Sequence, residues 1–282
     1  MNNSSCLGRN KMETTTTRQQ YFCEEENQYL EERTILHNEI IQQIIKQTFS
    51  DLNIIVNNDN REIIFIGGGS GSGKTTALRD ITDKLEDYVK VDADEIKKFL
   101  PEYSNSRHEN KAYLVHDESS DISLILLEEC RVKAYNVVYD GTMKNLTKYL
   151  KLFEDYKKTD YKVQILFVDC AIEVAFVRAT YRSRHGEQRV VPLDVIRTSN
   201  YLAAQSMYKV INDHLHLVDE ILIMNASSDN PTPIFYYSSE NNTQDIYDQL
   251  LYNEFETKAT LNYDEWLTPA ALLDIFEKKE AK

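Results

Sequence analysis

Short apolar runs alternate with longer amphipathic stretches along most of this chain. Glycine, asparagine or charged residues bound each run, as they bound buried strands. The five clearest runs lie at 62–67, 88–92, 136–140, 163–169 and 220–224, and a sixth lies at 234–237. Strands that alternate with helices form mostly parallel sheets with helices on both faces. The pattern therefore predicts an α/β fold with a sheet of five or six strands.

The region before the first run predicts disorder followed by a helix. Residues 1–27 carry few apolar side chains and include four consecutive threonines, which indicates disorder. Apolar residues recur at four-residue spacing from 28 to 49, which predicts a helix with one apolar face. A loop is expected from there to residue 60, because asparagine and aspartate dominate it.

The end of the chain predicts further helices. We expect the core domain to span 61–240 and the segment 241–282 to be helical, with helices at 245–255 and 269–279. Thr268 suits the N-cap of the second helix, and Pro269 suits its first helical position.

A glycine-rich loop joins the first predicted strand to a predicted helix. Residues 68–75 fit the pattern G-x-x-x-x-G-K-[ST], in the strand–loop–helix context that this phosphate-binding motif requires. Glycines let the backbone turn its amides toward phosphate oxygens, and the helix N-terminus adds partial positive charge. Lys74 would bind the β- and γ-phosphates, and Thr75 would bind Mg²⁺. The residues expected to bind the nucleotide are Gly68, Gly69, Ser70, Gly71, Ser72, Gly73, Lys74, Thr75 and Thr76.

Acidic residues follow the second and third predicted strands. In a parallel sheet, ligands bind at the carboxyl ends of the strands, so functional side chains are expected there. Asp94 is placed to orient an acceptor hydroxyl and take its proton, as a kinase requires, and it also suits the cap of a helix near Glu95. Asp140 and Thr142 could contact the acceptor, or Asp140 could hold Mg²⁺ through water, or the segment could be an ordinary strand-end turn.

The stretch 116–120, His-Asp-Glu-Ser-Ser, has two interpretations. Glu118 and Ser120 could contact the acceptor. The same residues also suit the capped start of the apolar helix that follows them.

Arginines gather after the fourth predicted strand. Residues 178–189 contain four arginines and one glutamate, in a chain whose net charge is −14. Guanidinium groups bind phosphate through paired hydrogen bonds and stay charged. We expect this segment to close over the triphosphate and exclude water, and the alternative is a solvated helix face.

These segments together resemble the zeta toxin family of P-loop kinases, over about residues 29–225. The segments that carry the resemblance are YLEERTILHNEII (29–41), GGGSGSGKTT (67–76), VDADEIKKFLPEY (91–103), HDESS (116–120), NVVYDGT (136–142) and RATYRSRHGEQRVVP (178–192). The resemblance implies transfer of the γ-phosphate of ATP or GTP to a small molecule, with Mg²⁺. In the best-known toxins the acceptor is UDP-N-acetylglucosamine, phosphorylated at its sugar 3′-hydroxyl, and in toxin–antitoxin members an antitoxin protein covers the nucleotide site.

The resemblance also implies a role for individual residues. Lys74 would bind phosphate, Thr75 would bind Mg²⁺ and Asp94 would be the general base. Arg182 and Arg189 match the two arginines that cover the triphosphate, and Asp140 occupies an acidic position of the substrate site.

Two positions differ from the family pattern. Ser70 replaces a proline that many members carry in the phosphate loop. Leu124 lies where the best-known toxins have a glutamate that contacts the sugar. The acceptor could therefore be another nucleotide sugar or a dinucleotide such as NAD, which related members use.

Composition restricts the alternatives. A net charge of −14 argues against binding to nucleic acid or to anionic membranes. No apolar run approaches the length of a membrane span, and no signal-peptide pattern is present. The four cysteines are far apart, which predicts free thiols in a cytoplasmic protein without zinc. Two other functions stay open, namely a nucleotide-dependent switch without phosphoryl transfer and a nucleic-acid end kinase.

Overall fold

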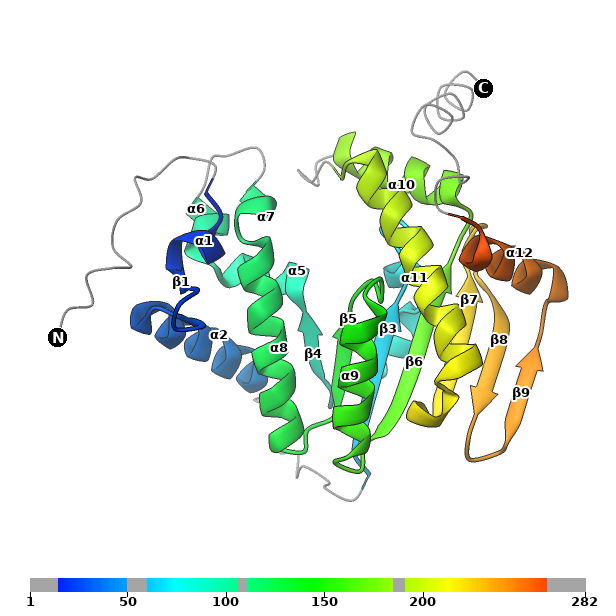
Figure 1. Ribbon diagram of the computed structural model, residues 1–282, viewed down its shortest axis with the longest axis horizontal. Coiled ribbons are helices and arrows are strands. Elements are labelled where there is room, and N and C mark those ends of the chain that lie inside the picture. Colours follow the sequence, from blue (N-terminus) through cyan, green and yellow to red (C-terminus); the bar gives the residue numbers. More distant parts are fainter. Residues whose placement is uncertain (1–14, 50–59, 106–110, 185–190, 263–282) are drawn as a thin grey trace.

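A seven-stranded sheet forms the centre of the molecule (Figure 1). The computed structural model describes residues 15–49, 60–105, 111–184 and 191–262. The strand order is β4-β5-β3-β6-β7-β8-β9, with β4 to β7 all parallel to β3 and with β8 and β9 antiparallel to their neighbours. The strands are β3 (Glu62–Gly67), β4 (Val89–Asp92), β5 (Val137–Asp140), β6 (Lys162–Asp169), β7 (Glu220–Asn225), β8 (Thr232–Ser238) and β9 (Thr243–Ile246). The predicted α/β fold with a mostly parallel sheet is confirmed.

Helices cover both faces of the sheet, because side chains alternate along each buried strand. Ile63 and Phe65 of β3 lie in the core that includes Phe153, whereas Ile64 and Ile66 pack in a second cluster with Leu78. The helices are α2 (Glu31–Phe49), α3 (Lys74–Ala77), α4 (Arg79–Thr82), α5 (Ala93–Ile96), α6 (Pro101–Asn105), α7 (Lys111–Leu114), α8 (His116–Val132), α9 (Leu146–Lys157), α10 (Ile172–Arg184), α11 (Leu193–Asp213) and α12 (Gln249–Thr260). Two 3₁₀ turns, Lys97–Phe99 and Leu215–Leu217, complete the helical part.

The strand order places a topological switch beside the glycine-rich loop. The chain leaves β3 and later returns to both of its sides, with β5 on one side and β6 on the other. Ligands of open parallel sheets bind at such a point, outside the carboxyl ends of the strands. Figure 1 shows these ends at the top, between α5, α6 and α7 on one side and α10 on the other.

The N-terminal region is more ordered than its composition predicted. Residues 17–21 form helix α1 (Thr17–Tyr21), and two short strands pair behind it, β1 (Phe22–Cys23) and β2 (Gln28–Tyr29). Thr16 and Gln19 form a reciprocal capping box. The expected disorder of 1–27 is therefore wrong for the described residues 15–27. These polar residues are ordered by contacts with α8, such as the hydrogen bond from Arg18 to Asp121, which local composition does not reveal.

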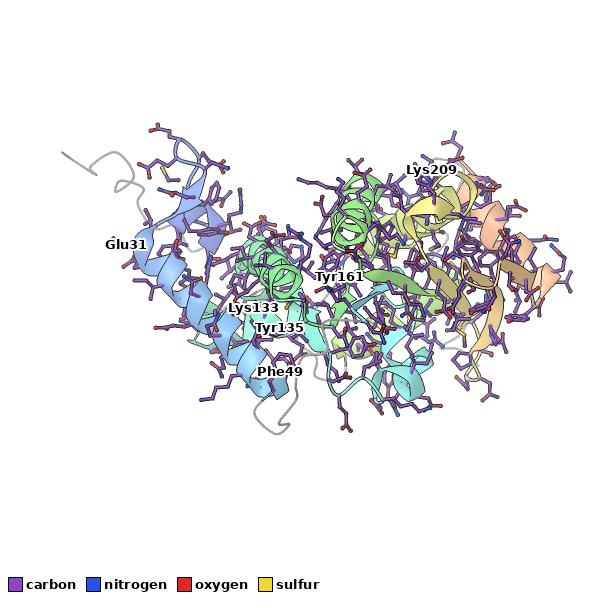
Figure 2. The ribbon with its side chains drawn as sticks, turned by 90° about the horizontal axis from the view of Figure 1, so that it is seen from below. Glu31, Phe49, Lys133, Tyr135, Tyr161 and Lys209 are labelled. Carbon is purple, nitrogen blue, oxygen red and sulfur yellow. The ribbon has the colours of Figure 1, made fainter. Side chains whose placement is uncertain are left out.

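Helix α2 begins three residues later than expected, at Glu31, and lies outside α8 (Figure 1). Figure 2 shows Phe49 at its far end, close to Tyr135, and the two ring centroids are 4.7 Å apart. The rest of the predicted loop, 50–59, lies outside the described residues.

The C-terminal region also differs in part. The helix expected at 245–255 is α12, which spans Gln249–Thr260, and residues 243–246 form the edge strand β9 instead. Apolar residues at Ile246 and Leu250 suggested one helix, but pairing with β8 fixes the first of them in the sheet. The helix predicted at 269–279, with Thr268 and Pro269, lies outside the described residues.

No helix among the described residues is long and apolar enough to cross a membrane.

Candidate active site

Several backbone amides of the phosphate loop, residues 68–75, have no acceptor in the described part of the chain. Among the residues that the structure describes, no acceptor is found for the amide groups of Gly71, Gly73, Lys74 and Thr75. Gly73 has a φ of 93°, a left-handed conformation that glycine adopts without strain. Unpaired amides are rare in folded proteins unless a ligand or water satisfies them. The loop therefore presents donors that suit phosphate oxygens.

Lys74 lies on the same loop. Its Nζ donates to the carbonyl oxygen of Gly68, 3.1 Å away. The ammonium group is thus held over the loop, where it can exchange a neutral carbonyl for a charged phosphate oxygen.

The helix after the loop is shorter than expected. It is broken at Leu78, which has a φ of −107° and a ψ of 3°, into the four-residue pieces α3 and α4. Aligned peptide dipoles sum over a helix, so this break reduces the contribution of the helix N-terminus to anion binding.

The segment after β5 is hydrogen-bonded to the entry of the phosphate loop. Gly68 N donates to Thr142 O at 3.3 Å, and Gly141 N donates to Ile66 O at 3.0 Å. Asp140 pairs in register with Ile66 on one side and with Asp92 on the other. Asp140 and Thr142, two predicted site residues, therefore lie directly beside the loop.

Three carboxylates meet at the ends of β4 and β5. The pKa of Asp140 is raised above its ordinary value, mainly by burial and also by the Asp94 carboxylate. The Lys74 ammonium acts in the opposite direction. Burial and the charge of Asp140 also raise the pKa of Asp92 to about 6, against a hydrogen bond from Asp94 N that lowers it. The structure thus brings Lys74, Asp94 and Asp140 together, although they lie far apart in the sequence.

Asp94 does not cap the helix near Glu95. The cap of α5 is Asp92, whose Oδ1 accepts a hydrogen bond from Asp94 N at 2.7 Å. The Asp94 side chain instead accepts a hydrogen bond from the Lys97 Nζ, 2.7 Å away, and is half exposed. The capping role belongs to a neighbour, and the Asp94 carboxylate faces the solvent side of the site.

Glu118 lies away from these residues, in a buried ion cluster. Its side chain is fully buried, and its oxygens accept hydrogen bonds from Arg33 at 2.5 and 2.8 Å and from His37 at 2.6 Å. Ser120 donates to the carbonyl of His116, 3.0 Å away, as a residue near a helix start does. The helix expected here is α8, but its expected cap is wrong, because the N-cap is Val115 and no side chain makes a capping hydrogen bond.

The arginine segment is described only in part. Arg182 lies on α10 and is exposed, whereas Arg189 lies outside the described residues. Arg178, which was not among the predicted site residues, does reach the loop. Its Nη1 donates to Ser72 O at 3.3 Å and to Ala226 O at 2.8 Å.

Two further residues touch the phosphate loop without any local signal in the sequence. Ser199 and Asn200 of α11 are hydrogen-bonded to the backbone of Ser70. Because the Ser70 amide is used in this way, Ser70 does not offer an amide to a phosphate. Nothing in the amphipathic pattern of 193–213 singled these residues out.

The side chains of the described residues do not by themselves form a metal site. Within the described part of the chain, no group of three His, Cys, Asp or Glu residues is arranged to hold a metal ion. Mg²⁺ often binds through one or two protein oxygens together with phosphates and water, and the exposed Thr75 hydroxyl suits that mode.

Comparisons with known proteins agree with this fold. A family model described as Zeta toxin matches residues 45–249. A chain from the crystal structure of AvrRxo1-ORF1:AvrRxo1-ORF2 with sulphate ions aligns with a TM-score of 0.71 and 16% identity, over 95% of this chain and 94% of that chain. A chain from the AvrRxo1-ORF1:-ORF2 structure with ATP gives a TM-score of 0.71 and 17% identity, over 88% and 83% of the two chains.

A third solved structure comes from the PezAT chromosomal toxin-antitoxin system of Streptococcus pneumoniae. It aligns with a TM-score of 0.62 and 17% identity, over 89% of this chain and 96% of that chain. At such identities the likeness shows the fold. No curated protein sequence matches this one.

Proposed function

The chain belongs to the zeta toxin family, and we propose that it transfers the γ-phosphate of ATP to a hydroxyl group of a small molecule. One observation carries the proposal, namely the meeting of Lys74, Asp94 and Asp140 at the carboxyl ends of three strands. A phosphate-binding lysine beside a half-exposed carboxylate gives both halves of a kinase site, a donor and an acceptor.

The donor half is the phosphate loop. The amides of Gly71, Gly73 and Thr75, which meet no acceptor among the described residues, and the ammonium of Lys74 would bind the β- and γ-phosphates. A solved relative of the same fold is described as a complex with ATP, which supports ATP as the donor, and GTP is the other candidate.

Mg²⁺ would be held by the Thr75 hydroxyl together with nucleotide phosphates. When bound, Mg²⁺ neutralises phosphate charge and orients the triphosphate for displacement.

The acceptor half is formed by Asp94, with Asp140 and Thr142 beside it. Asp94 would accept a hydrogen bond from the acceptor hydroxyl and so direct its oxygen at the γ-phosphorus. The acceptor oxygen forms a bond to the γ-phosphorus, the bond from that phosphorus to the β,γ-bridging oxygen breaks, and the hydroxyl proton passes to Asp94. The products are ADP and a phosphorylated acceptor.

Arg182 and Arg189 are proposed to cover the triphosphate. Guanidinium groups near the triphosphate would stabilise the charge that develops on the transferring phosphoryl group. Exclusion of water by the same segment would favour transfer over hydrolysis.

The acceptor class follows from the family, and we propose a nucleotide sugar such as UDP-N-acetylglucosamine, or a dinucleotide. Glu118 is not assigned to the acceptor, because Arg33 and His37 already occupy its carboxylate oxygens. The proposed class is tested by incubating the protein with a cell extract and labelled ATP and identifying the labelled products by mass spectrometry. Label found only in inorganic phosphate would instead favour a nucleotide-dependent switch, and label on oligonucleotide ends would favour an end kinase.

An antitoxin partner is also proposed. The relatives described as PezAT form a toxin-antitoxin system, and the same arrangement here would place a second protein on this one. Co-expression with the neighbouring gene products, followed by purification of the complex, would test for such a partner.

The central test replaces the proposed base. We expect Asp94→Asn to lower kcat by about 100-fold or more, the usual loss when a positioned proton acceptor is removed. Lys74→Ala should abolish transfer through loss of phosphate binding. Initial rates of ADP formation in the presence of the acceptor measure both effects.

The matched control is Glu95→Gln. Glu95 is the next carboxylate along the same helix, is exposed and pairs with Lys98. Its substitution should leave kcat within twofold of the wild-type value, an order-of-magnitude limit expected for a residue outside the site. Full transfer activity in Asp94→Asn would contradict the proposed role of Asp94.

A further inference from the structure

Helix α11 holds the apex of the phosphate loop by both backbone groups of one residue. Ser70 N donates to Ser199 Oγ at 3.0 Å, and Asn200 Nδ2 donates to Ser70 O at 2.9 Å. Ser199 and Asn200 are each only 2% exposed. The two side chains are thus shielded from water, although the hydrogen bonds that they make to Ser70 are only partly buried.

The two side chains are themselves held in place. Ser199 Oγ donates to Ile196 O at 3.1 Å while it accepts from Ser70 N. Asn200 Nδ2 donates to Ile196 O at 2.8 Å as well as to Ser70 O. Two carbonyl acceptors around one amide nitrogen determine the orientation of the Asn200 amide. We call this pair, Ser199 and Asn200, the loop clamp.

The backbone of α11 packs directly on the loop beside the clamp. A Cβ atom placed on Gly69 would lie 2.5 Å from the Cα of Asn200, closer than such atoms approach. The described backbone of Gly69 does not have a positive φ, unlike that of Gly73. Glycine at position 69 is therefore required by the closeness of α11 and not by an unusual backbone conformation.

The clamp acts on the part of the loop that has least support of its own. Ser70 lies between the end of β3 at Gly67 and the start of α3 at Lys74. Ordering one backbone residue costs about 1–2 kcal/mol of conformational entropy at 25 °C. If the loop is already ordered in the free protein, phosphate binding does not have to order it, and the affinity for the phosphate is higher.

We propose that Ser199 and Asn200 are positioning residues that hold the phosphate loop in its nucleotide-binding shape before the nucleotide arrives. They would act through Ser70 and touch no phosphate. The inference rests on the proposed function only in that the loop binds a nucleoside triphosphate. It needs neither the acceptor nor the transfer step, so a protein that binds ATP without transferring phosphate would still test it.

The first experiment measures binding of ATP and Mg²⁺ by titration calorimetry in Ser199→Ala and Asn200→Ala. We expect the Kd for ATP to rise by about 10-fold in each, the effect of losing one hydrogen bond from a binding-competent state. In turnover assays, the KM for ATP should rise while the KM for the acceptor stays unchanged. Ser206→Ala is the matched control, because Ser206 is a buried serine on the same helix and the described hydrogen bonds from α11 to the loop come from Ser199 and Asn200.

A second variant separates the clamp from general stability. Ser70→Pro removes the amide hydrogen and puts a ring carbon where that hydrogen points at Ser199 Oγ, which is 3.0 Å from the nitrogen. The proline should therefore weaken ATP binding in the wild-type background and be tolerated when Ser199→Ala has removed the hydroxyl. The loss of ATP-binding free energy in the double variant should therefore be smaller than the sum of the losses in the two single variants.

Two results would overturn the inference. One is a Kd for ATP within twofold of the wild-type value in both clamp variants, with only the melting temperature lowered. The other is strict additivity of Ser70→Pro and Ser199→Ala in the free energy of ATP binding. Absence of ATP binding in the wild-type protein would overturn the proposed function together with the inference. The two results above, obtained with a wild-type protein that binds ATP, would overturn the inference alone, so the two failures are distinguishable.

Discussion

At the scale of single residues, Asp92 is a buried carboxylate next to other carboxylates, an arrangement that is electrostatically unfavourable. Burial and the neighbouring charges of Asp140 and Asp94 raise its pKa to about 6 from the ordinary 3.8. Its Oδ1 also caps α5, so the same side chain that costs electrostatic free energy fixes the backbone next to Asp94. Such conflicts are typical of functional sites, where stability is given up for geometry.

This conflict predicts a stabilising substitution. Because the folded pKa of Asp92 is raised, the folded state binds more protons, and its stability should fall as pH rises from about 4 to about 6. Asp92→Asn keeps the capping oxygen and removes the charge. At pH 7 we expect it to raise the free energy of unfolding by on the order of 3 kcal/mol, since a rise of the pKa from 3.8 to about 6 corresponds to about 1.4 kcal/mol per pKa unit.

Urea denaturation of wild type and Asp92→Asn at pH 3 and pH 7 checks this expectation. The gain should vanish at pH 3, where the wild-type carboxyl is protonated in both states. An equal gain at both pH values would mean that the effect does not come from the charge of Asp92.

At the scale of elements, a buried ion cluster joins α2 to α6 and α8. Arg33 of α2 donates to both oxygens of Glu118 on α8 and to both oxygens of Glu102 on α6. Burial alone would raise the pKa of Glu118, but hydrogen bonds from Arg33, His37 and Thr17 bring that pKa down to about 2. The cluster fixes α6, the helix that follows the Asp94 segment, against the N-terminal region.

We expect Glu118→Gln to destabilise the fold by about 3 kcal/mol at pH 7, because it leaves the buried guanidinium of Arg33 without one of its two carboxylates. The folded pKa of Glu118 is depressed, so its contribution is present above about pH 4.5 and is lost as pH falls toward 2. The difference between variant and wild type should therefore shrink over that range.

The control for this prediction is Glu128→Gln. Glu128 lies on the same helix and pairs with Arg131 three residues away at the surface. Surface pairs contribute little, so we expect a change below about 0.5 kcal/mol. Urea midpoints measured from pH 2 to pH 7 compare both variants, and equal losses in the two would contradict a special role for the buried cluster.

At the scale of the whole molecule, one sheet and one large core connect the distant parts of the chain. The main buried cluster contains residues of α2, such as Ile41, together with Phe255 of α12. The family match begins only at residue 45, yet Arg33 and His37, which precede it, hold Glu118 inside it. The described N-terminal region is thus an integral part of the fold.

This connectivity predicts that ATP stabilises the chain as one unit. At a free concentration of 100 times its Kd, a ligand that binds only the folded state contributes about 2.7 kcal/mol. We expect ATP with Mg²⁺ to raise a single melting transition of the wild type and to leave that of Lys74→Ala unchanged. Differential scanning calorimetry distinguishes this from two transitions of which only one responds, which would show that the parts unfold separately.

The sequence alone determined the features that depend on residues close to one another along the chain. The phosphate loop is recognisable because glycines, Lys74 and Thr75 must follow one another closely to surround a phosphate. Six of the seven strands of the described sheet were placed within two residues, because burial favours short, continuous apolar runs. Edge strand β9 was missed, since a mostly exposed four-residue strand with a single apolar residue, Ile246, carries no such signal.

The tertiary structure decided what distant residues do to one another. It assigned the helix cap to Asp92 and left the Asp94 carboxylate paired with Lys97. It placed Glu118 beside Arg33, which lies 85 residues away, and Ser199 beside Ser70, which lies 129 residues away. A hydrogen-bonding side chain has the same local pattern whichever partner it meets. The sequence therefore specified the chemistry of the phosphate loop, and only the packing of α11 specified what holds that loop in place.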